Sequence, residues 1–197
     1  MPLPKQKHDT RFTYADYLTW PPEERWELID GVAYDMTPAP NVTHQSIVLN
    51  IGRIIADYLE GKDCKVFVAP VDVILPESSS TSDENIFTVV QPDIVVVCNK
   101  KKIEKRGIIG APDLVVEVLS ESTAYKDETE KLKLYERHGV REYWIVNPEA
   151  YYLNVFRLGS DGTFEKPLHY RKGETFKSSV LEGLIIDGNR VFEGIEI

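Results

Sequence analysis

The sequence predicts an α/β sandwich, in which apolar strands form a central sheet that helices cover on both faces. Residues 93–98 and 113–119 are almost entirely apolar, as strands buried on both faces are. Residues 42–60 instead repeat apolar side chains every three or four positions, which is the pattern of an amphipathic helix. A second helical segment, residues 127–138, separates the run at 113–119 from a further strand at 143–146.

The N-terminal segments carry shorter signals. Residues 12–20 are expected to form a short helix, because two prolines follow and proline does not continue a helix. Residues 27–36 are expected to form two strands that turn at Asp30 and Gly31, a dipeptide favoured in hairpin turns. The helix at 42–60 is expected to stop at Gly61. Its apolar face would consist of Ile47, Ile51, Ile54, Ile55 and Tyr58.

The remaining segments complete the predicted domain. Residues 66–75 are expected to form a strand, and the polar residues 77–91, which contain SSSTSDEN, a mobile loop. After Pro148, a strand at 151–158 and a turn at 159–162 predict a β extension. At 197 residues the chain is long enough for one sizeable core. We therefore predict one domain over 1–197, with a core at about 42–148 and the extension at 149–197.

Composition narrows the class of protein. The chain contains no apolar run near the ~18 residues that cross a bilayer, and its first ten residues lack an apolar signal region. We therefore expect a soluble protein of the cytoplasm with no membrane partner. Its two cysteines, Cys64 and Cys98, suit a reducing compartment and are expected to be buried thiols.

Charge argues against a general electrostatic grip on nucleic acid, because the formal net charge is -9. One segment is locally basic: residues 100–106, KKKIEKR, carry five cations and one glutamate. It is either a solvated connector or a loop that contacts phosphate. The four histidines and two cysteines lack zinc spacing, and no P-loop, nucleophile elbow or dinucleotide-binding glycine pattern occurs.

Glu117 is the first candidate for chemistry, because it interrupts the apolar run LVVEVL. Strand alternation places it on one face together with Val115 and Leu119. A carboxylate in a dry interior needs a cation or hydrogen bonds, since leaving it ionised and unpaired costs several kcal/mol. A salt bridge and a metal site satisfy this need equally well.

Asp93 is the second candidate, at the start of PDIVVV directly after Pro92. Such an aspartate is commonly a solvated or capping residue. If its strand pairs with that of Glu117, however, two carboxylates converge and offer the oxygen ligands that Mg²⁺ prefers. Asp113 follows another proline, but it lies about 13 Å from Glu117 along the same strand, too far to share one ion.

The helix at 127–138 carries Asp127, Lys131 and Tyr135 at four-residue intervals, which places them along one stripe. These residues form either a surface salt bridge beside a tyrosine or an arrangement that points the Lys131 ammonium toward the carboxylates of Asp93 and Glu117. A cation there stabilises negative charge in a phosphoryl transition state.

Several ordered motifs resemble a known family. Gln91-Pro92-Asp93, followed by Glu117-Val118-Leu119-Ser120, is similar to the PD-(D/E)XK arrangement of restriction-type nucleases. More narrowly, the chain resembles the Uma-type restriction endonuclease family over nearly its whole length. The motifs are WELIDGVAY (26–34), PDIVVV (92–97), PDLVVEVLS (112–120), D-x-x-x-K-x-x-x-Y (127–135) and GVREYWIVNP (139–148).

The resemblance implies a restriction endonuclease-like αβββαβ core with a mixed central sheet, an N-terminal helix and hairpin, and a C-terminal β extension. It implies Asp93 and Glu117 as metal-binding carboxylates, with the Val118 carbonyl assisting. Leu119 stands where the superfamily has lysine, so the resemblance assigns that role to Lys131 on the next helix.

Two further positions match the family. The resemblance makes Glu27 a further ligand or water-orienting base, and its alternative role is that of a strand-surface glutamate. His44 falls in a family-like position, but a helix-start or core histidine is the commoner role.

Three functions remain open from the sequence. The first is a Mg²⁺-dependent DNA endonuclease, with Mn²⁺ as a substitute ion, in which Asp93, Glu117, Lys131 and Glu27 are catalytic. The second is an inactive nuclease fold that binds DNA or a protein. The third is an unrelated enzyme acting on a small phosphorylated substrate. Such folds often work as homodimers that reach both DNA strands, so a homodimer is expected.

Overall fold

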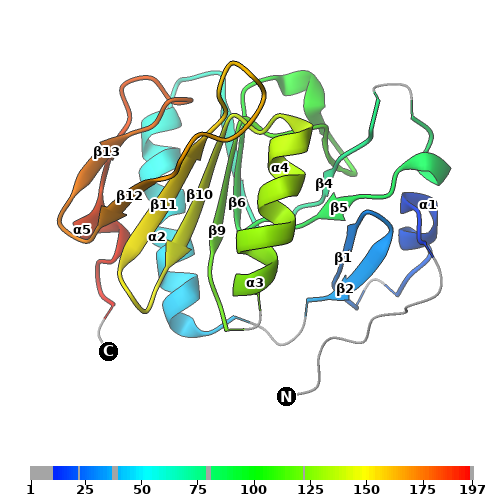
Figure 1. Cartoon of the computed structure of the whole chain (residues 1–197), viewed down its shortest axis with the longest axis horizontal. Coiled ribbons are helices and arrows are strands. Elements are labelled where there is room, and N and C mark those ends of the chain that lie inside the picture. Colours follow the sequence, from blue (N-terminus) through cyan, green and yellow to red (C-terminus); the bar gives the residue numbers. More distant parts are fainter. Residues whose placement is uncertain (1–10, 22, 37–39, 79–80, 122, 196–197) are drawn as a thin grey trace.

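A six-stranded mixed sheet forms the centre of the computed structural model, which describes residues 11–21, 23–36, 40–78, 81–121 and 123–195 (Figure 1). The strand order is β12-β11-β10-β9-β6-β3, and only the neighbours β9 and β10 of this sheet run parallel. The strands are β3 (Lys65–Val68), β6 (Ile94–Val97), β9 (Leu114–Val118), β10 (Glu142–Asn147), β11 (Tyr152–Arg157) and β12 (Leu168–Arg171). The prediction of central apolar strands is confirmed, because β6 and β9 are buried throughout.

Helix α2 (Val42–Leu59) covers one face of this sheet. It begins where the Asn41 side chain accepts a hydrogen bond from the His44 amide, which caps its first turn. Its predicted apolar face is buried: Ile47, Ile51 and Ile55 pack with alternate residues of β6 and β9. Figure 1 shows this helix behind the sheet.

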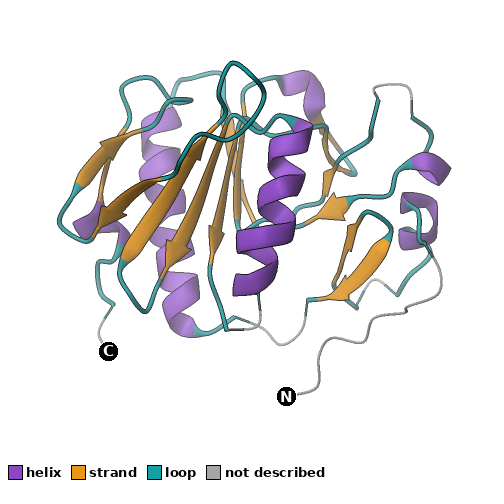
Figure 2. Cartoon of the chain, in the orientation of Figure 1, coloured by secondary structure: helices purple, strands orange, loops and turns teal. Residues whose placement is uncertain are grey.

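The opposite face is covered by a helix that runs from residue 124 to residue 138, shown in front of the sheet in Figure 2. It consists of α3 (Ala124–Lys126), a π-helical turn η3 (Asp127–Lys131) and α4 (Leu132–His138). Gly139 ends it with a φ of 81°, a left-handed conformation that glycine adopts without steric cost. The predicted helix is confirmed, but it begins three residues earlier and contains a wide turn.

A second six-stranded sheet, with the order β2-β1-β5-β4-β8-β7, lies beside the first. The predicted hairpin is present as its first two strands. The strands are β1 (Trp26–Ile29), β2 (Val32–Asp35), β4 (Val73–Ile74), β5 (Val89–Val90), β7 (Ile103–Glu104) and β8 (Gly107–Ile109). The short helix α1 (Tyr14–Tyr17), capped by Thr13, packs Tyr14 against its core.

The predicted strand at 66–75 is wrong in one respect, because it is two strands in different sheets. β3 ends before Pro70, which has no N–H to continue the ladder, and the chain then crosses to β4. The predicted loop at 77–91 is also too long. It contains the 3₁₀ turn η1 (Asp83–Asn85), and Ile86 and β5 are buried because their apolar side chains complete the second sheet's core.

A buried carboxylate of the central sheet accepts several hydrogen bonds from the C-terminal β extension. After β12 the chain forms β13 (Thr175–Lys177), β14 (Ile185–Asp187) and α5 (Gly188–Val191). Between β13 and β14, donors from residues 178–180 converge on Glu142 of β10. Trp144 Nε1 donates to the same carboxylate at 2.6 Å. This acceptor therefore links the extension to the central sheet, in addition to the buried side chains of Phe176, Leu184 and Ile186.

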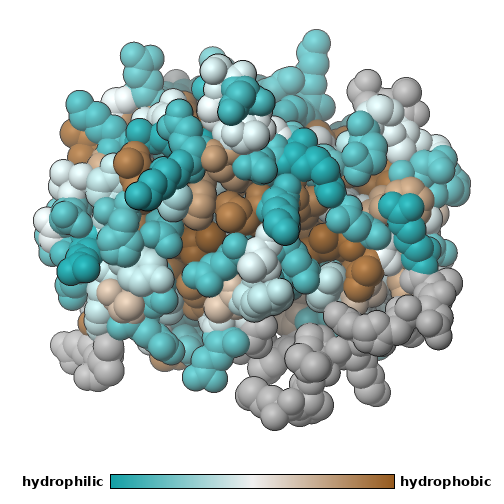
Figure 3. Space-filling view, in the orientation of Figure 1, coloured by the Kyte–Doolittle hydropathy of each residue, from teal (hydrophilic) through white to brown (hydrophobic). Residues whose placement is uncertain are grey.

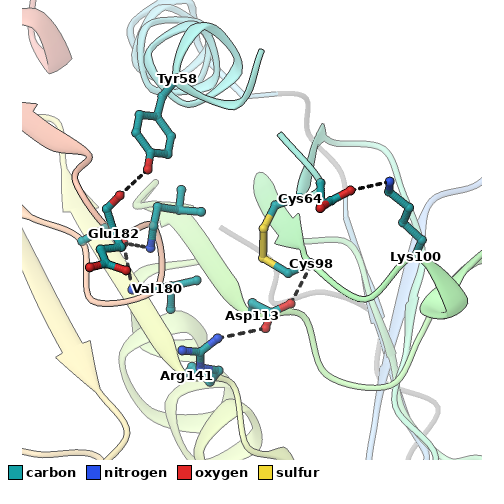
Figure 4. Close-up of a disulfide and its surroundings, with 11 residues drawn as sticks. Tyr58, Cys64, Cys98, Lys100, Asp113, Arg141, Val180 and Glu182 are labelled. Atoms are coloured by element: carbon teal, nitrogen blue, oxygen red, sulfur yellow. Dashed lines mark hydrogen bonds and ion pairs between the residues drawn. A yellow bond between two sulfur atoms is a disulfide. The ribbon is translucent and has the colours of Figure 1, made fainter. Parts of the chain in front are cut away.

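The expectation of two free thiols is wrong, because Cys64 and Cys98 form a disulfide (Figure 4). The cause is strand register. Lys65 of β3 pairs with Val97 of β6, so the residues immediately outside that pair face one another. Their separation of 34 positions hides this proximity in the sequence.

Most of the face in Figure 3 is hydrophilic, with apolar atoms gathered near its middle. Within the described ranges, no helix combines the length and the apolar character needed to cross a bilayer.

Candidate functional site

The strand register brings Asp93 and Glu117 together. Ile94 of β6 lies opposite Val116 of β9 in an antiparallel pair, so one step outward places Asp93 opposite Glu117. The Asp93 amide accordingly donates to Glu117 Oε2 at 3.3 Å. Two acidic residues that are 24 positions apart in the chain thus meet at one end of the buried sheet.

Asp93 is held by the strand beside it and by α2. Its Oδ2 accepts a hydrogen bond from the Val118 amide at 2.8 Å, and His44 Nε2 lies 3.1 Å from the same oxygen. In a β ladder the N–H and C=O of one residue point to the same neighbour, so the Val118 carbonyl belongs to the edge that faces Asp93. The Asp93 carboxylate is therefore held in place while remaining partly exposed.

Glu117 is held from the helix on the other side. Lys131 Nζ lies 2.7 Å from its Oε1, and Tyr135 Oη donates to the same oxygen at 2.9 Å. The predicted stripe therefore points at the carboxylate. Asp127 joins it through an ion pair of 3.6 Å with Lys131.

Glu27 of β1 completes the cluster from the second sheet. Its Oε1 lies 2.8 Å from Lys131 Nζ and accepts a hydrogen bond from the backbone N–H of Gln91 at 2.9 Å. Its Oε2 lies 2.6 Å from Lys126 Nζ. Glu27 is fully buried, so it is not the strand-surface glutamate of the alternative interpretation. Both of its oxygens are engaged by cations or an amide.

The π turn explains how two lysines reach one carboxylate. Lys126 and Lys131 are five residues apart, which in an α-helix places their side chains about 140° apart around the axis. In a π turn hydrogen bonds join residues five apart, so such residues lie nearly above one another. Both ammonium groups consequently face Glu27.

The protonation of the cluster follows from burial and charge. Burial, opposed by the Lys131 ammonium and reinforced by neighbouring carboxylates, raises the pKa of Glu117 to about 8. Burial likewise raises the pKa of Asp127 to about 6. Burial also acts on Glu27, but the ammonium groups of Lys131 and Lys126 outweigh it and lower its pKa to about 2.

Lys131 keeps its proton. Burial disfavours its charge, but the three carboxylates around it raise its pKa well above the usual value. The site therefore contains one permanent buried ammonium, one ionised glutamate and two carboxyls, Glu117 and Asp127, with raised pKa values.

The charges of the cluster fit a divalent cation. The cluster contains four carboxylates and two ammonium groups. When all six are ionised and the His44 imidazole is neutral, two negative charges are unbalanced. In the described part of the chain, the buried Asp127 Oδ1 also has no hydrogen-bond partner. These groups are Glu27, Asp93, Glu117, Asp127, Lys126 and Lys131.

The ligands offered to such a cation are few. Among the described residues, no group of three or more histidine, cysteine, aspartate and glutamate side chains is arranged as a preformed metal cluster. Asp93 and Glu117 with the Val118 carbonyl form a smaller set of oxygens. Mg²⁺ commonly binds proteins through one or two carboxylates while keeping several waters, so this set fits Mg²⁺.

Other residues flagged in the sequence lie elsewhere. Asp113 is at the far end of β9, where it accepts from the Cys98 amide at 2.7 Å and from Arg141 at 3.3 Å (Figure 4). In the basic segment 100–106, Lys100 pairs with Asp63, and Arg106 pairs with Asp83.

Three contacts of the site were missed by sequence reasoning: those of His44, Lys126 and Gln91. His44 is a buried residue near a helix start, as expected, but it contacts Asp93 directly. Lys126 falls outside the four-residue stripe, and only the π turn brings it into the cluster. The backbone N–H of Gln91, two residues before Asp93, donates to Glu27, and nothing in the sequence indicated this contact.

Comparison with known proteins agrees with this architecture. A family model described as Uma2, "Putative restriction endonuclease", matches residues 14–188. A solved structure described as a "putative nuclease belonging to DUF820", from Anabaena variabilis ATCC 29413, superposes with a TM-score of 0.72 and 19% identity. The match covers 92% of this chain and 97% of that one, and at this identity it concerns the fold.

Two curated proteins of Synechocystis sp. (strain ATCC 27184 / PCC 6803 / Kazusa) are also similar. Uncharacterized protein slr1290 is 26% identical over 150 residues, which are 75% of this chain and 74% of that protein. Uncharacterized protein sll1609 is 23% identical over 154 residues, which are 76% of this chain and 82% of that protein.

Proposed function

This chain belongs to the Uma2 family, and on that premise we propose that it is a Mg²⁺-dependent endonuclease that hydrolyses phosphodiester bonds in DNA. The observation that carries the proposal is the meeting of Asp93 and Glu117 beside a buried ammonium. Carboxylates that can hold a metal ion, beside a fixed cation that stabilises negative charge, suit phosphodiester hydrolysis.

Asp93, Glu117 and the Val118 carbonyl would hold the ion, and Mn²⁺ would substitute for Mg²⁺. When bound, the cation supplies a Lewis acid for the phosphate and lowers the pKa of a coordinated water. Asp93 is suited to this task because the Val118 amide and His44 fix one of its oxygens. Glu117 is oriented by Lys131 and Tyr135.

Lys131 contributes a fixed positive charge. It lies in a water-poor cluster, where an oriented charge stabilises a developing phosphorane-like anion more strongly than it would in water. Glu27 positions this ammonium through Oε1, which also accepts a hydrogen bond from the backbone N–H of Gln91.

The reaction is tested by incubating the purified full chain with supercoiled plasmid DNA and Mg²⁺ or Mn²⁺. We expect nicking that EDTA suppresses and that is lost in Asp93→Asn. Asp113→Asn is the matched control, because it alters the second Pro-Asp pair at the other end of β9. Cleavage that persists in Asp93→Asn would contradict the site.

A separate measurement concerns metal binding. Mn²⁺ should raise the Tm of the wild type but not of Glu117→Ala, since a ligand that binds the folded state stabilises it. Duplex binding without cleavage, and without a Tm response to metal, would identify a nuclease-fold binding module instead.

A further inference from the structure

The two lysines of the cluster differ in what they have left to offer a substrate. An ammonium group has three N–H donors. Lys131 Nζ faces three carboxylates, at 2.7 Å, 2.8 Å and 3.6 Å, and its side chain is 3% exposed. Two of its donors are therefore committed to Glu117 and Glu27, and the third faces Asp127 inside the protein, so it acts on a substrate through its charge.

Lys126 is in the opposite situation. In the described part of the chain its one ion-pair partner is Glu27, at 2.6 Å, which takes one of its three donors. Its Nζ also lies 5.4 Å from the centre of the Tyr34 ring. Its side chain is 13% exposed, and that of Asp93 is 18% exposed, whereas the side chains of Glu27, Glu117, Asp127 and Lys131 are at most 5% exposed. Lys126 and Asp93 are thus the ion-paired members of the cluster that reach solvent.

Glu27 keeps a counter-charge when Lys126 leaves it. After such a release, Glu27 Oε1 still faces Lys131 and still accepts the hydrogen bond from the backbone N–H of Gln91. Its Oε2 loses the hydrogen bond from Lys126, but the larger penalty of an unpaired buried charge does not arise.

We propose that Lys126 is the residue that binds the substrate's phosphate directly, exchanging its contact with Glu27 for a phosphate oxygen. This rests on the proposed function for the nature of the substrate. It divides the work between two lysines: Lys131 holds Glu117 and the local charge, and Lys126 makes the hydrogen bond to the phosphodiester.

The basic segment 100–106 is a weaker candidate for this contact. Lys100 and Arg106 are paired with aspartates, and Lys102 Nζ donates to the Ala111 carbonyl at 2.6 Å. These cations already bind parts of the protein, and the described contacts connect none of them with Asp93 or Glu117.

The test compares Lys126→Met and Lys126→Arg with Lys133→Met. Lys133 is an exposed lysine of the same helix and lies outside the cluster, so its substitution controls for net charge. Binding of a fluorescent DNA duplex is measured by anisotropy with Ca²⁺ in place of Mg²⁺, over a series of salt concentrations. One lost phosphate contact should reduce the slope of log K against log salt by about 0.9.

We expect this reduction for Lys126→Met, no reduction for Lys133→Met and partial recovery for Lys126→Arg. With Mg²⁺, kcat of Lys126→Met should fall about 100-fold, the loss typical of removing one donor to a developing anion. A purely structural role would lower the Tm without changing the salt slope.

Two outcomes overturn the proposal. One is a Lys126→Met protein whose salt slope equals that of Lys133→Met, and the other is a wild type that binds no duplex. If the salt slope falls in Lys126→Met but not in Lys133→Met, and the wild type nevertheless cleaves no DNA, the phosphate contact is supported and the proposed function is contradicted.

Discussion

The imidazole of His44 lies against the carboxylate of Asp93, with Nε2 at 3.1 Å from Oδ2. This contact joins α2, on one face of the central sheet, to the residue that precedes β6. A ring that carries its proton on Nε2 donates to the oxygen and fixes its direction, as groups behind a metal ligand do.

His44→Ala should therefore loosen Asp93 and weaken Mn²⁺ binding by about 10–100-fold, the usual effect of losing such a supporting group. Isothermal titration calorimetry measures the affinity, and His169→Ala, at an exposed position on β12, is the control. Equal affinities in the two variants would show that His44 only fills space.

The raised pKa of Glu117 predicts a pH dependence of stability in metal-free protein. The folded state binds this proton more tightly than the unfolded state does, so the free energy of unfolding falls as pH rises from about 4.5 to about 8. Asp127 acts in the same direction below about pH 6, and burial lowers the pKa of His138 from 6.5, which acts in the opposite direction below pH 6.5. The window from 6.5 to about 8 is therefore the one that reports on Glu117. Urea titrations in EDTA should show this fall, and Glu117→Gln should flatten it. A wild type that is equally stable at pH 6.5 and pH 8 would argue against the raised pKa.

Glu142→Gln should destabilise the C-terminal extension. The buried carboxylate accepts from Trp144 and from donors at 178–180, and an amide would set its own N–H groups against some of them. The free energy of unfolding in urea should fall by about 1–3 kcal/mol, and proteolysis near residue 179 should be faster. Glu149→Gln, on the surface, is the control. Unchanged cleavage near residue 179 would mean that the extension is held by other contacts.

Reduction of the disulfide should lower stability without removing the site. Opening a link between residues 34 positions apart costs about 3–4 kcal/mol of chain entropy. The Tm should fall in dithiothreitol for the wild type and should not respond in Cys98→Ser. Metal binding at the opposite end of β6 should survive, and its loss would show that the two ends are coupled.

Local pattern was enough to predict much of this architecture. The apolar runs predicted β6 and β9, and the three-and-four spacing predicted α2. The four-residue stripe left two roles open, and the structure has the one in which Lys131 points at Glu117. These features depend on periodicity, which a single segment contains in full.

What could not be predicted depends on how separate segments meet. Register alone joins Cys64 to Cys98, and the crossing of the chain after Pro70 alone places β4 in a different sheet from β3. His44 reaches Asp93 because of the way α2 lies on the sheet. None of these relations leaves a mark on either segment by itself.

The wide turn at Asp127–Lys131 holds one residue more than α-helical geometry needs. Deletion of the exposed Glu128 would let the ladder close regularly and would place Lys126 four residues before Lys131. Residues four apart in an α-helix lie on one face, so both ammonium groups would still face Glu27, and Leu134 and Tyr135 would keep their places in the core. A one-residue gap here would therefore spare both the fold and the pair of lysines, although a position-by-position comparison of relatives would misalign Lys126.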